Sequence, residues 1–328
     1  MGGENSPQKI IEGAHLALSY YPAIKFIFFG NEKKIKPFLD KYLNLAKVSQ
    51  IHHTEDVVCD TDKPSHALRT GRQSSMRLAI NAVKEGKANA VISSGNTGAY
   101  MAMAKFVLKT FPGIHRPAIA TLIPSASSEF VAMDLGANVT CDAENLEEFA
   151  ILGSAYAKSV LGISDPRVGI LNIGEEEQKG LPILHEAAEK LKGNRHINFT
   201  GFVEADALFK GTTDVVVTDG FTGNILLKTI EGTAKLLKNF LTKAFASSLL
   251  SKVGYIFSRP ALKYLSNRIN PSHYNGAMFL GLKGIAIKSH GKADSIGFAS
   301  AISVAIDMMQ YDFKDSVLKM MDRSEETH

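Results

Sequence analysis

The 328-residue sequence contains only two cysteines, Cys59 and Cys141, and no long uninterrupted run of apolar residues. Two cysteines are too few for a disulfide framework, which indicates a reducing compartment. No stretch approaches the ~18 consecutive apolar residues of a membrane-spanning helix, so a polytopic membrane protein is excluded. The first twenty residues also lack the basic start and clean apolar run of a secretory signal. These absences predict a cytoplasmic protein.

Acidic residues are missing from one long stretch, between Glu231 and Asp294. Residues 232–293 carry ten basic side chains and no acidic one, whereas the rest of the chain carries 27 basic and 33 acidic. The net charge of +4 is therefore the sum of +10 in this stretch and −6 elsewhere. A surface of one sign attracts acidic partners, although a solvated basic face without any partner would look the same.

Large apolar residues such as Leu250, Ile256 and Phe257 are interleaved with the lysines and arginines of this stretch. This mixture is typical of an interfacial helix on anionic lipid. Helices that pack in a core or in a dimer would show a similar pattern. Nucleic acid is not expected as a partner, since zinc-finger spacing and a basic heptad pattern are both missing.

Composition and pattern predict an α/β protein. Apolar residues make up 45% of the chain and charged residues 21%, which excludes disorder as the main state. Short apolar runs alternate with amphipathic helical windows. The expected strands are 25–30, 90–93, 117–123, 130–135, 168–173 and 214–218. The expected helices are 8–20, 74–85, 97–110, 143–161, 182–192, 224 to about 250, and 295–309.

The length suggests about two domains, but no low-complexity linker divides the chain. We therefore expect one interleaved body over residues 1–328, with the basic helical stretch 224–272 inserted into it as an arm. Residues 1–7 form one more glycine-bearing turn of the kind that ends a strand, without a strand before it.

Four other glycine-bearing turns follow apolar runs, at 93–99, 134–141, 172–180 and 218–224. In an open α/β sheet, ligands bind beyond the carboxyl ends of the strands, where such turns gather. The turns Gly95–Gly98 and Gly220–Gly223 share the pattern G-x-T-G between a strand and a helix. Glycine admits a close anion and a helix N-terminus presents free N–H groups, so this pair predicts an anion site. Simple helix capping by the asparagine and threonine side chains is the alternative explanation.

The usual nucleotide and hydrolase motifs are not present. The chain contains neither G-x-x-x-x-G-K-[ST] nor G-x-G-x-x-G, and no G-x-S-x-G elbow. The sequence His185-Glu186-Ala187-Ala188-Glu189 lacks the second histidine of a zinc protease. The two cysteines have no sequence support as nucleophiles.

A series of ordered segments carries a resemblance to a known family. The segments are MGGENSP at the start, RTGRQSSM (69–76), SSGNTGA (93–99), RPA (116–118), MDLGAN (133–138), LNIGEEEQKG (171–180), DVVVTDGFTGN (214–224), KTIEG (228–232), residues 274–284 and His290-Gly291. Together they resemble the bacterial phosphate acyltransferases of phospholipid synthesis, the PlsX family, over nearly the whole chain. The family usually begins with a strand ending in D-A-M-G-G-D, so Glu4 replaces an aspartate here. Arg72 also stands where a lysine is common, and Lys292-Ala293-Asp294 replaces small polar residues.

The resemblance implies a three-layer α/β/α fold like that of isocitrate and isopropylmalate dehydrogenases, shared with phosphate acetyltransferases. It implies transfer of a fatty acyl group from acyl carrier protein to inorganic phosphate, which gives acyl phosphate. It also implies a homodimer loosely attached to the inner face of the membrane. Neither a metal nor a cofactor is expected, because phosphate can attack a thioester directly if the enzyme orients it and stabilises the oxyanion.

From this chemistry we select the candidate site residues. The candidate catalytic residues are Asn96, Thr97, Asp219, Asn224 and His290, with the histidine as a possible proton donor to the leaving thiolate. The candidate substrate-binding residues are Arg72, Ser74, Ser75, Gly95, Gly98, Asp134, Asn138, Lys179, Gly220, Thr222 and Gly223. We expect the two G-x-T-G turns to serve opposite sides of one anionic group.

Other functions remain open from the sequence. A phosphate acetyltransferase-like enzyme would use a coenzyme A thioester, which is also anionic. A hydride-transfer enzyme of the same fold would need a metal and a nicotinamide. A non-catalytic membrane-docking protein would use only the basic arm.

Overall fold

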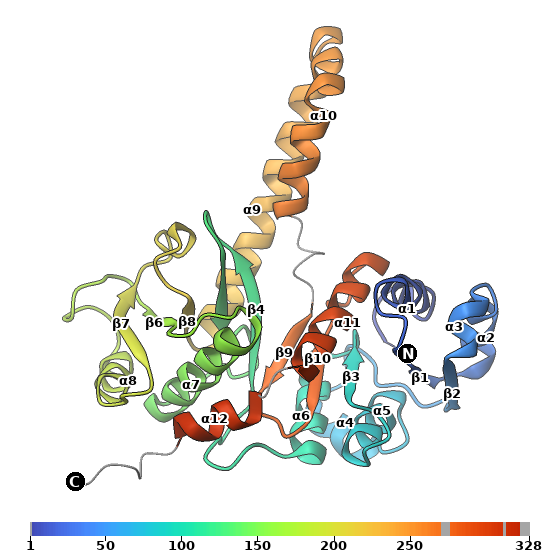
Figure 1. Cartoon of the computed structure of the whole chain (residues 1–328), viewed down its shortest axis with the longest axis horizontal. Helices are drawn as coiled ribbons and strands as arrows, with labels where there is room; N and C mark the ends of the chain where they lie inside the picture. Colours follow the sequence, from blue (N-terminus) through green and yellow to red (C-terminus); the bar gives the residue numbers. More distant parts are fainter. Residues whose placement is uncertain (1, 270–275, 311–312, 322–328) are drawn as a thin grey trace.

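The computed structural model describes residues 2–269, 276–310 and 313–321. An eight-stranded sheet forms its centre, and helices cover both faces (Figure 1). Its strands follow in the order β3 (Ala90–Ser93), β10 (Ile285–Lys288), β9 (Ala277–Leu280), β4 (Ala118–Pro124), β5 (Glu129–Met133), β8 (Val215–Val217), β6 (Arg167–Leu171) and β7 (Asn198–Val203). The α/β fold predicted from the sequence is thus confirmed.

The helices also fall close to their expected positions. Those that the sequence predicts are α1 (Gln8–Tyr20), α5 (Ser75–Lys84), α6 (Thr97–Leu108), α7 (Ala143–Val160), α8 (Pro182–Lys192), α9 (Gly220–Ala246) and α11 (Ser295–Gln310). The further helices are α2 (Glu32–Leu39), α3 (Leu43–Lys47), α4 (Pro64–Thr70), α10 (Leu249–Ile269) and α12 (Phe313–Met321), with a 3₁₀ turn at Leu208–Lys210. A small parallel sheet of β1 (Phe26–Gly30) and β2 (Ser49–His53) lies beside β3.

The direction of the strands divides the sheet into two halves. The strands β3 and β10 are parallel, and β5, β8, β6 and β7 form a second parallel group. Between them, β9 and β4 make antiparallel pairs with their neighbours. Three successive antiparallel pairings reverse the direction, so β8 runs opposite to β3. This reversal decides where the glycine-bearing turns lie.

Alternating side chains along the strands build two apolar layers, as the two-residue period of a strand requires. Val131 and Met133 of β5 face α7, whose Phe149 and Leu152 are fully buried. The intervening residue Ala132 belongs to the layer on the other face, with α6 and the first turns of α9. Burial of a side chain such as Phe149 contributes about 1.5–3 kcal/mol.

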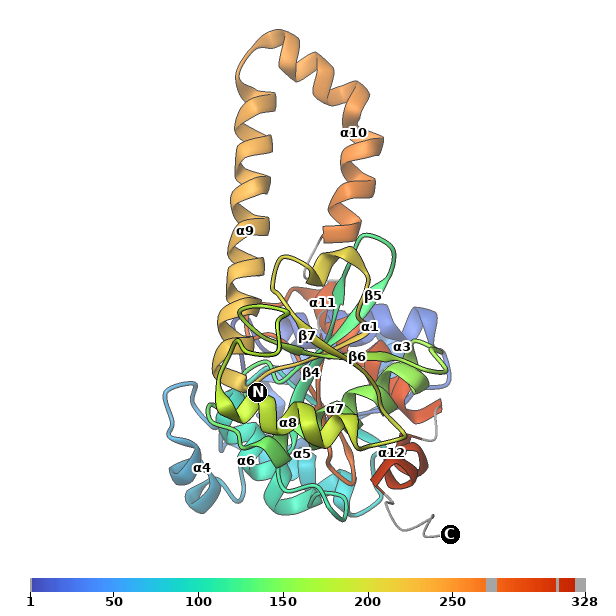
Figure 2. The same ribbon diagram turned by 90° about the vertical axis from the view of Figure 1, so that its left-hand side faces the viewer.

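The helices α9 and α10 project from the body as a long arm (Figures 1 and 2). Only the first turns of α9 pack on the sheet, through Leu226, Leu227 and Ile230. The helix pair takes the place of the expected arm, although α9 begins at Gly220 and residues 270–272 lie outside the described part of the chain. Within the described residues, no helix has the length and apolar character needed to cross a bilayer.

Candidate functional site

Three of the four glycine-bearing turns meet at one edge of the sheet. They follow β5, β6 and β8, which are adjacent and parallel, so their carboxyl ends lie side by side. Arg167 of β6 fixes the alignment, because its Nε and Nη2 each donate to the carboxylate of Asp214 at 2.9 Å. A bidentate pair of this kind adds geometric precision to its charge. We call the resulting group of turns, 134–141, 172–180 and 218–224, the β5–β8–β6 edge.

Asp134 organises the first of these turns. Its buried carboxylate accepts hydrogen bonds from the backbone N–H groups of Ile119, Ala137 and Asn138 and from the Asn138 side chain, at 2.7–3.1 Å. Burial raises the pKa of Asp134, and these four bonds oppose the rise because they stabilise the charged form. The Asn138 amide also donates to the Pro117 carbonyl at 2.9 Å. Asp134 and Asn138 therefore shape the turn from beneath, inside the protein.

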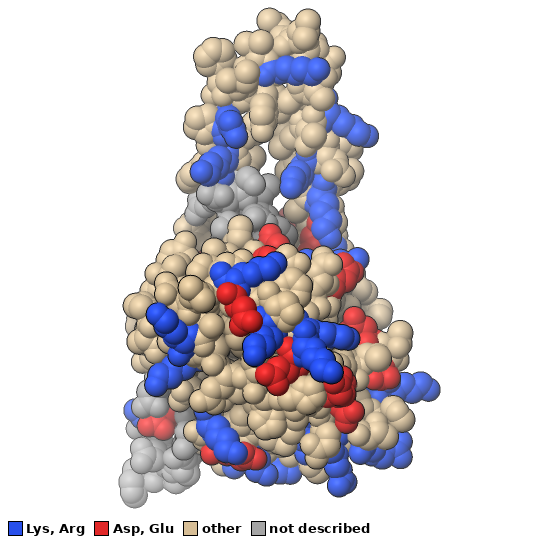
Figure 3. Space-filling model, turned by 90° about the vertical axis from the view of Figure 1, so that its right-hand side faces the viewer, with Lys and Arg blue, Asp and Glu red and all other residues tan. Residues whose placement is uncertain are grey.

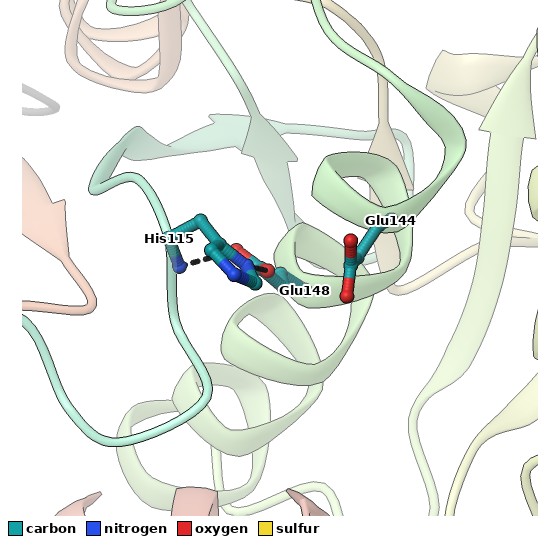
Figure 4. Close-up of side chains that lie close together, drawn as sticks. All are labelled: His115, Glu144 and Glu148. Atoms are coloured by element: carbon teal, nitrogen blue, oxygen red, sulfur yellow. Dashed lines mark hydrogen bonds and ion pairs between the residues drawn. The ribbon is translucent and has the colours of Figure 1, made fainter.

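The segment before β4 is fastened to helix α7 by a charged pair (Figure 4). Glu148 of α7 is buried and accepts hydrogen bonds from the backbone N–H of His115 at 2.9 Å and from its ring. Glu144 lies one helical turn away, close enough for the three groups to form a conceivable metal cluster. Both Glu148 oxygens accept hydrogen bonds from His115. Anchoring the loop before β4 to α7 is therefore a sufficient role for this pair.

The third turn leads directly into α9 and packs against the first. The Gly220 N–H donates to the Asn138 carbonyl at 2.7 Å, and a Cβ on Gly220 would stand 2.6 Å from that oxygen. Asp219 caps the helix and accepts from the N–H and hydroxyl of Thr222 at 2.9 and 2.8 Å. Gly223 is buried against Asp134, while the Asn224 side chain lies over Gly136. The helix N-terminus, with its partial positive charge, is thereby held at this edge.

The second turn brings a lysine to the same edge. Lys179 is half exposed and pairs with Glu176 at 2.8 Å, a contact that raises the pKa of the lysine. Its backbone carbonyl accepts a hydrogen bond from the side chain of Asn172 at 2.8 Å. Asn172 is itself buried at the end of β6, so it fixes the conformation of the turn that carries Lys179. Lys179 remains charged at neutral pH and can attract an anion.

The fourth turn, with Gly95, Asn96, Thr97 and Gly98, lies elsewhere. It follows β3, which runs opposite to β8, so the two strands enter their turns in opposite directions. The pairing register places the ends of the two strands near one row of the sheet, which runs through Ile92, Ile287, Met278, Ala120, Met133 and Val217. The expectation that both G-x-T-G turns serve one anionic group therefore stays a prediction.

Asn96 is committed to holding its own loop. Its Oδ1 caps α6 by accepting from the Ala99 N–H at 3.0 Å. Its amide nitrogen donates to the carbonyls of Cys59, Asp60 and Asp62 at 2.9–3.1 Å. The capping alternative thus describes Asn96, while the neighbouring Thr97 is exposed.

Ser74 and Ser75 are buried at the start of α5. The Ser74 hydroxyl donates to Gly71 at 2.7 Å and accepts from the Arg77 N–H at 3.3 Å, which makes it a helix cap. The Ser75 N–H donates to the Asp56 carbonyl at 2.9 Å. Arg72 is exposed beside them. None of these residues belongs to the β5–β8–β6 edge.

Lys288, a residue that the sequence analysis did not select, ends β10 beside the Gly95–Gly98 turn. It is only 8% exposed, and burial lowers its pKa to about 8. Two residues further on, His290 has a lowered pKa because part of its ring is buried and Lys228 lies close by. No glycine-bearing turn of the kind used to select the other site residues marks Lys288 in the sequence. Its position at the end of an apolar strand was a clue that could have identified it.

The helix α9 connects the two edges. Asn224 and Lys228 stand four residues apart and so share one face of the helix. Lys228 forms an ion pair with Glu231 at 2.9 Å, and both act electrostatically on His290. Asn224 thus lies at the β5–β8–β6 edge. One turn further along α9, the charge of Lys228 acts on His290 at the β3–β10 edge.

The cysteine beside the β5–β8–β6 edge is not activated. Burial, with the charge of Asp134, raises the pKa of Cys141 to about 12, so its thiol stays protonated. Chemistry at the β5–β8–β6 edge must instead use a lysine, neutral donors and a helix N-terminus. This donor set suits an anionic substrate.

Comparison with solved structures supports the fold. A phosphotransacetylase from Streptococcus pyogenes superposes with a TM-score of 0.61 at 19% identity, over 92% of each chain. The EutD phosphotransacetylase from Staphylococcus aureus gives a TM-score of 0.57 at 16% identity, over 93% of this chain and 92% of that one. At these identities the likeness shows a shared fold, the one that the sequence resemblance implied.

Comparison with sequences is more specific. A phosphate acyltransferase from Rhodospirillum centenum is 53% identical over 318 residues, which cover 97% of this chain and 90% of the relative. One from Rhodospirillum rubrum is 52% identical, over 97% of this chain and 91% of the relative. The model of a family described as fatty acid synthesis protein matches residues 1–316. The chain therefore belongs to this fatty acid synthesis protein family, the PlsX family predicted from its motifs.

Proposed function

We propose that this protein transfers a fatty acyl group from acyl carrier protein to inorganic phosphate and releases acyl phosphate. The single observation that carries the proposal is the β5–β8–β6 edge, where the turn that carries Lys179 and the N-terminus of α9 with Asn224 follow adjacent parallel strands. The relatives named phosphate acyltransferase support the same reaction class. The enzyme is accordingly an acyltransferase.

The reaction requires one addition and one elimination. A phosphate oxygen attacks the thioester carbonyl carbon, the C–O bond forms and the carbonyl oxygen takes the negative charge. The C–S bond then breaks, and the carrier thiolate takes up the proton that phosphate gives up. Orientation of the two substrates and stabilisation of the oxyanion are the main demands on the protein.

The residues of the β5–β8–β6 edge meet these demands in distinct ways. Lys179 supplies positive charge for phosphate, and the Asn224 amide supplies a neutral donor from the start of α9. Thr222 adds a hydroxyl at the N-terminus of α9, held in place by Asp219. Asp134, Asn138, Gly220 and Gly223 position the backbone beneath them.

We assign the β3–β10 edge to the thioester end of the reaction. Thr97 and the backbone at Gly95 and Gly98 lie there with Lys288 and His290. The lowered pKa of His290 keeps its ring neutral at pH 7, so it can accept the phosphate proton before passing it to the thiolate. Lys228 follows Asn224 by one turn of α9 and lies close to this histidine.

Acyl carrier protein is the proposed acyl donor because the arm is basic. Figure 3 shows lysine and arginine side chains on the arm, whereas acidic side chains gather on the body. Residues 232–269 carry no acidic side chain, and α9 contributes Lys235, Lys238 and Lys243. Complementary charge would steer an acidic carrier toward the base of this arm.

The tip of the arm is proposed to bind the anionic inner face of the membrane. Leu249, Leu250 and Phe257 are each more than 80% exposed there, and Lys252 and Arg259 accompany them. Apolar side chains enter the interfacial region while the cations contact anionic headgroups. The protein would then be cytoplasmic and peripherally attached.

A homodimer is proposed on the basis of exposed apolar side chains of helix α9 in the arm. Leu236, Leu237 and Phe240 of α9 are each about half exposed, in a region that the body does not cover. A second copy would bury them, since exposed apolar patches of this kind commonly mark interfaces. Sedimentation equilibrium would show a dimer that Phe240→Asp dissociates.

The decisive experiment measures acyl phosphate formed from acyl carrier protein and phosphate, with the acyl–coenzyme A thioester as the competing donor. Asn224→Ala should raise KM for phosphate, whereas Thr97→Ala should raise KM for the thioester. Full phosphate-dependent turnover in folded Asn224→Ala would contradict the proposed phosphate site. A preference for coenzyme A would point to a phosphate acetyltransferase-like enzyme. Lipid binding without any acyl phosphate would leave only a docking function.

A further inference from the structure

A second stretch of the chain is poor in acidic residues, and it lies in the body. Residues 63–128 carry nine basic side chains and a single acidic one, Glu85. They include the helices α4, α5 and α6, of which α6 packs against both of the others. Because the chain outside residues 232–293 carries more acidic than basic residues, these helices form a positively charged region on a body that is otherwise acidic.

Most of these positive charges have no neighbouring carboxylate to neutralise them. Glu85 pairs with Lys87 at 2.7 Å, which uses the one acidic residue of the stretch. In the described part of the chain, no carboxylate forms an ion pair with five other cations, which belong to α4, α5, α6 or the residues just after them: Arg69, Arg72, Arg77, Lys105 and Lys109. All five are wholly or partly exposed. We call these five residues, together with Phe106, the α4–α6 basic surface.

Phe106 brings two of these cations together. Its ring is 54% exposed on α6, and the Arg77 guanidinium and the Lys109 Nζ lie 5.1 and 5.0 Å from the ring centroid. Cation–π contacts of this length hold both cations beside the ring. Burial, together with the like charge of Arg72, lowers the pKa of Arg77, so the neighbouring charges repel one another. An acidic partner would offset this repulsion, and arginine with an exposed aromatic ring is typical of protein interfaces.

The position of the α4–α6 basic surface favours a soluble partner. In Figures 1 and 2, α4, α5 and α6 lie at the end of the body away from the tip of the arm. With the tip bound to the membrane as proposed, this surface lies far from the bilayer. The partner that it fits is therefore an acidic protein and not an anionic lipid.

The same surface lies next to the turn that is assigned to the thioester. Helix α6 begins at Thr97, in the turn that follows β3. The Asn96 amide fastens this turn to three backbone carbonyls of residues 59–62, just before α4. A protein that delivers a thioester to this turn would therefore contact α4 and α6.

We propose that the α4–α6 basic surface is the docking site of the acyl carrier protein, whose acidic side chains pair with its cations while the thioester enters at the Gly95–Gly98 turn. The inference rests on the proposed function, because it takes the carrier as the acyl donor. The arm attracts the carrier over long range, and this surface supplies the close contacts. The first turns of α9, at the base of the arm, belong to the same apolar layer as α6, so both regions lie on one face of the sheet.

The test reverses two charges of the surface, in a variant with Arg77→Glu and Lys105→Glu. Calorimetric titration measures binding of the acyl-free carrier protein. Turnover is measured with the acyl carrier protein and with the same acyl chain as a thioester of free pantetheine. The matched control reverses Lys33 and Lys34, two exposed lysines of α2, by Lys33→Glu and Lys34→Glu. If the first variant does not fold, Lys105→Glu with Lys109→Glu replaces it.

The charge reversal should raise Kd for the carrier, and KM for its acyl form, by about tenfold or more, and should make binding less sensitive to salt. KM for acyl-pantetheine and for phosphate should stay unchanged, as should every constant of the control. Wild-type affinity for the carrier in the variant would overturn the docking site and leave the proposed reaction intact. A wild type that turns over acyl-pantetheine but not the acyl carrier protein would overturn the proposed donor, and the docking site with it. Loss of binding to anionic vesicles, with carrier binding unchanged, would show that the surface contacts lipid and would also overturn the docking site.

Discussion

Gly223 sits directly against the backbone carbonyl of Asp134, with no room for a Cβ atom between them. This contact joins the turn after β5 to the first turn of α9. It explains why glycine occupies the fourth position of the second G-x-T-G pattern. The reason is close packing of two backbones, and the packing places the N-terminus of α9 at the β5–β8–β6 edge.

Gly223→Ala should therefore destabilise the protein and impair phosphate binding. The added methyl group must displace either α9 or the Asp134 turn, and overpacking of this kind typically costs about 1–3 kcal/mol. We expect a lower urea midpoint and a higher KM for phosphate. Gly232→Ala is the matched control on the same helix, because nothing lies within 4 Å of its Cβ position. That change should stabilise the helix by up to about 1 kcal/mol. Equal effects of the two substitutions would contradict the packing argument.

Lys179→Met should weaken phosphate binding without unfolding the protein. The lysine is half exposed, so its loss leaves no buried charge. A charge-assisted hydrogen bond to an anion contributes about 1.5–3 kcal/mol, so KM for phosphate should rise about tenfold or more. Lys192→Met on α8 is the control, since Lys192 has similar exposure and two acidic neighbours. An unchanged KM in Lys179→Met would remove this residue from the site.

The buried Lys288 should make stability depend on pH in the alkaline range. Its pKa is lowered to about 8 in the folded protein, whereas an unfolded lysine titrates near 10.4. Between these values the unfolded chain binds more protons, so the free energy of unfolding should rise with pH. Below pH 8 the buried charge costs about 3 kcal/mol.

Lys288→Met should remove this rise and stabilise the protein at pH 7, as urea unfolding from pH 7 to 10.5 would show. The exposed Lys283 in the same hairpin supplies the control, Lys283→Met. If the alkaline rise persists in Lys288→Met, another group causes it. If Lys288 also contacts substrate, the stabilised variant should lose turnover.

The sequence predicted the elements well because local patterns determine them. The turn after β8 could be located from its glycines, and Asp219 was a recognisable helix cap. The place of each turn in the sheet could not be predicted in this way. The strands β9 and β4 reverse the sheet direction through pairings between distant segments, such as Ala118 with Leu280. The burial of the Lys288 side chain depends in the same way on the packing around β10, which the local sequence does not describe.

The pair of His115 and Glu148 should give the opposite pH dependence. The hydrogen bond and charge of Glu148 raise the pKa of His115 above its usual value near 6.5. The stabilisation is therefore complete below pH 6.5 and is lost as pH rises through the higher folded pKa. In urea unfolding between pH 5.5 and about 9, the wild type should lose more stability than His115→Gln. His66→Gln on α4 is the control for an exposed histidine. Parallel curves for wild type and His115→Gln would contradict the pairing.

The arm provides the last prediction, which concerns the membrane. Phe257 is 81% exposed on α10, and insertion of a phenylalanine contributes about 1.5–3 kcal/mol. Phe257→Asp should therefore reduce binding to anionic vesicles by at least about tenfold in a sedimentation assay. Leu43→Asp, at a comparably exposed apolar residue on the body, should leave binding unchanged. Raising the salt concentration should weaken wild-type binding, because headgroup attraction to the basic residues is screened. Equal sedimentation of Phe257→Asp and wild type would exclude the tip of the arm as the membrane contact and leave its apolar surface to protein partners.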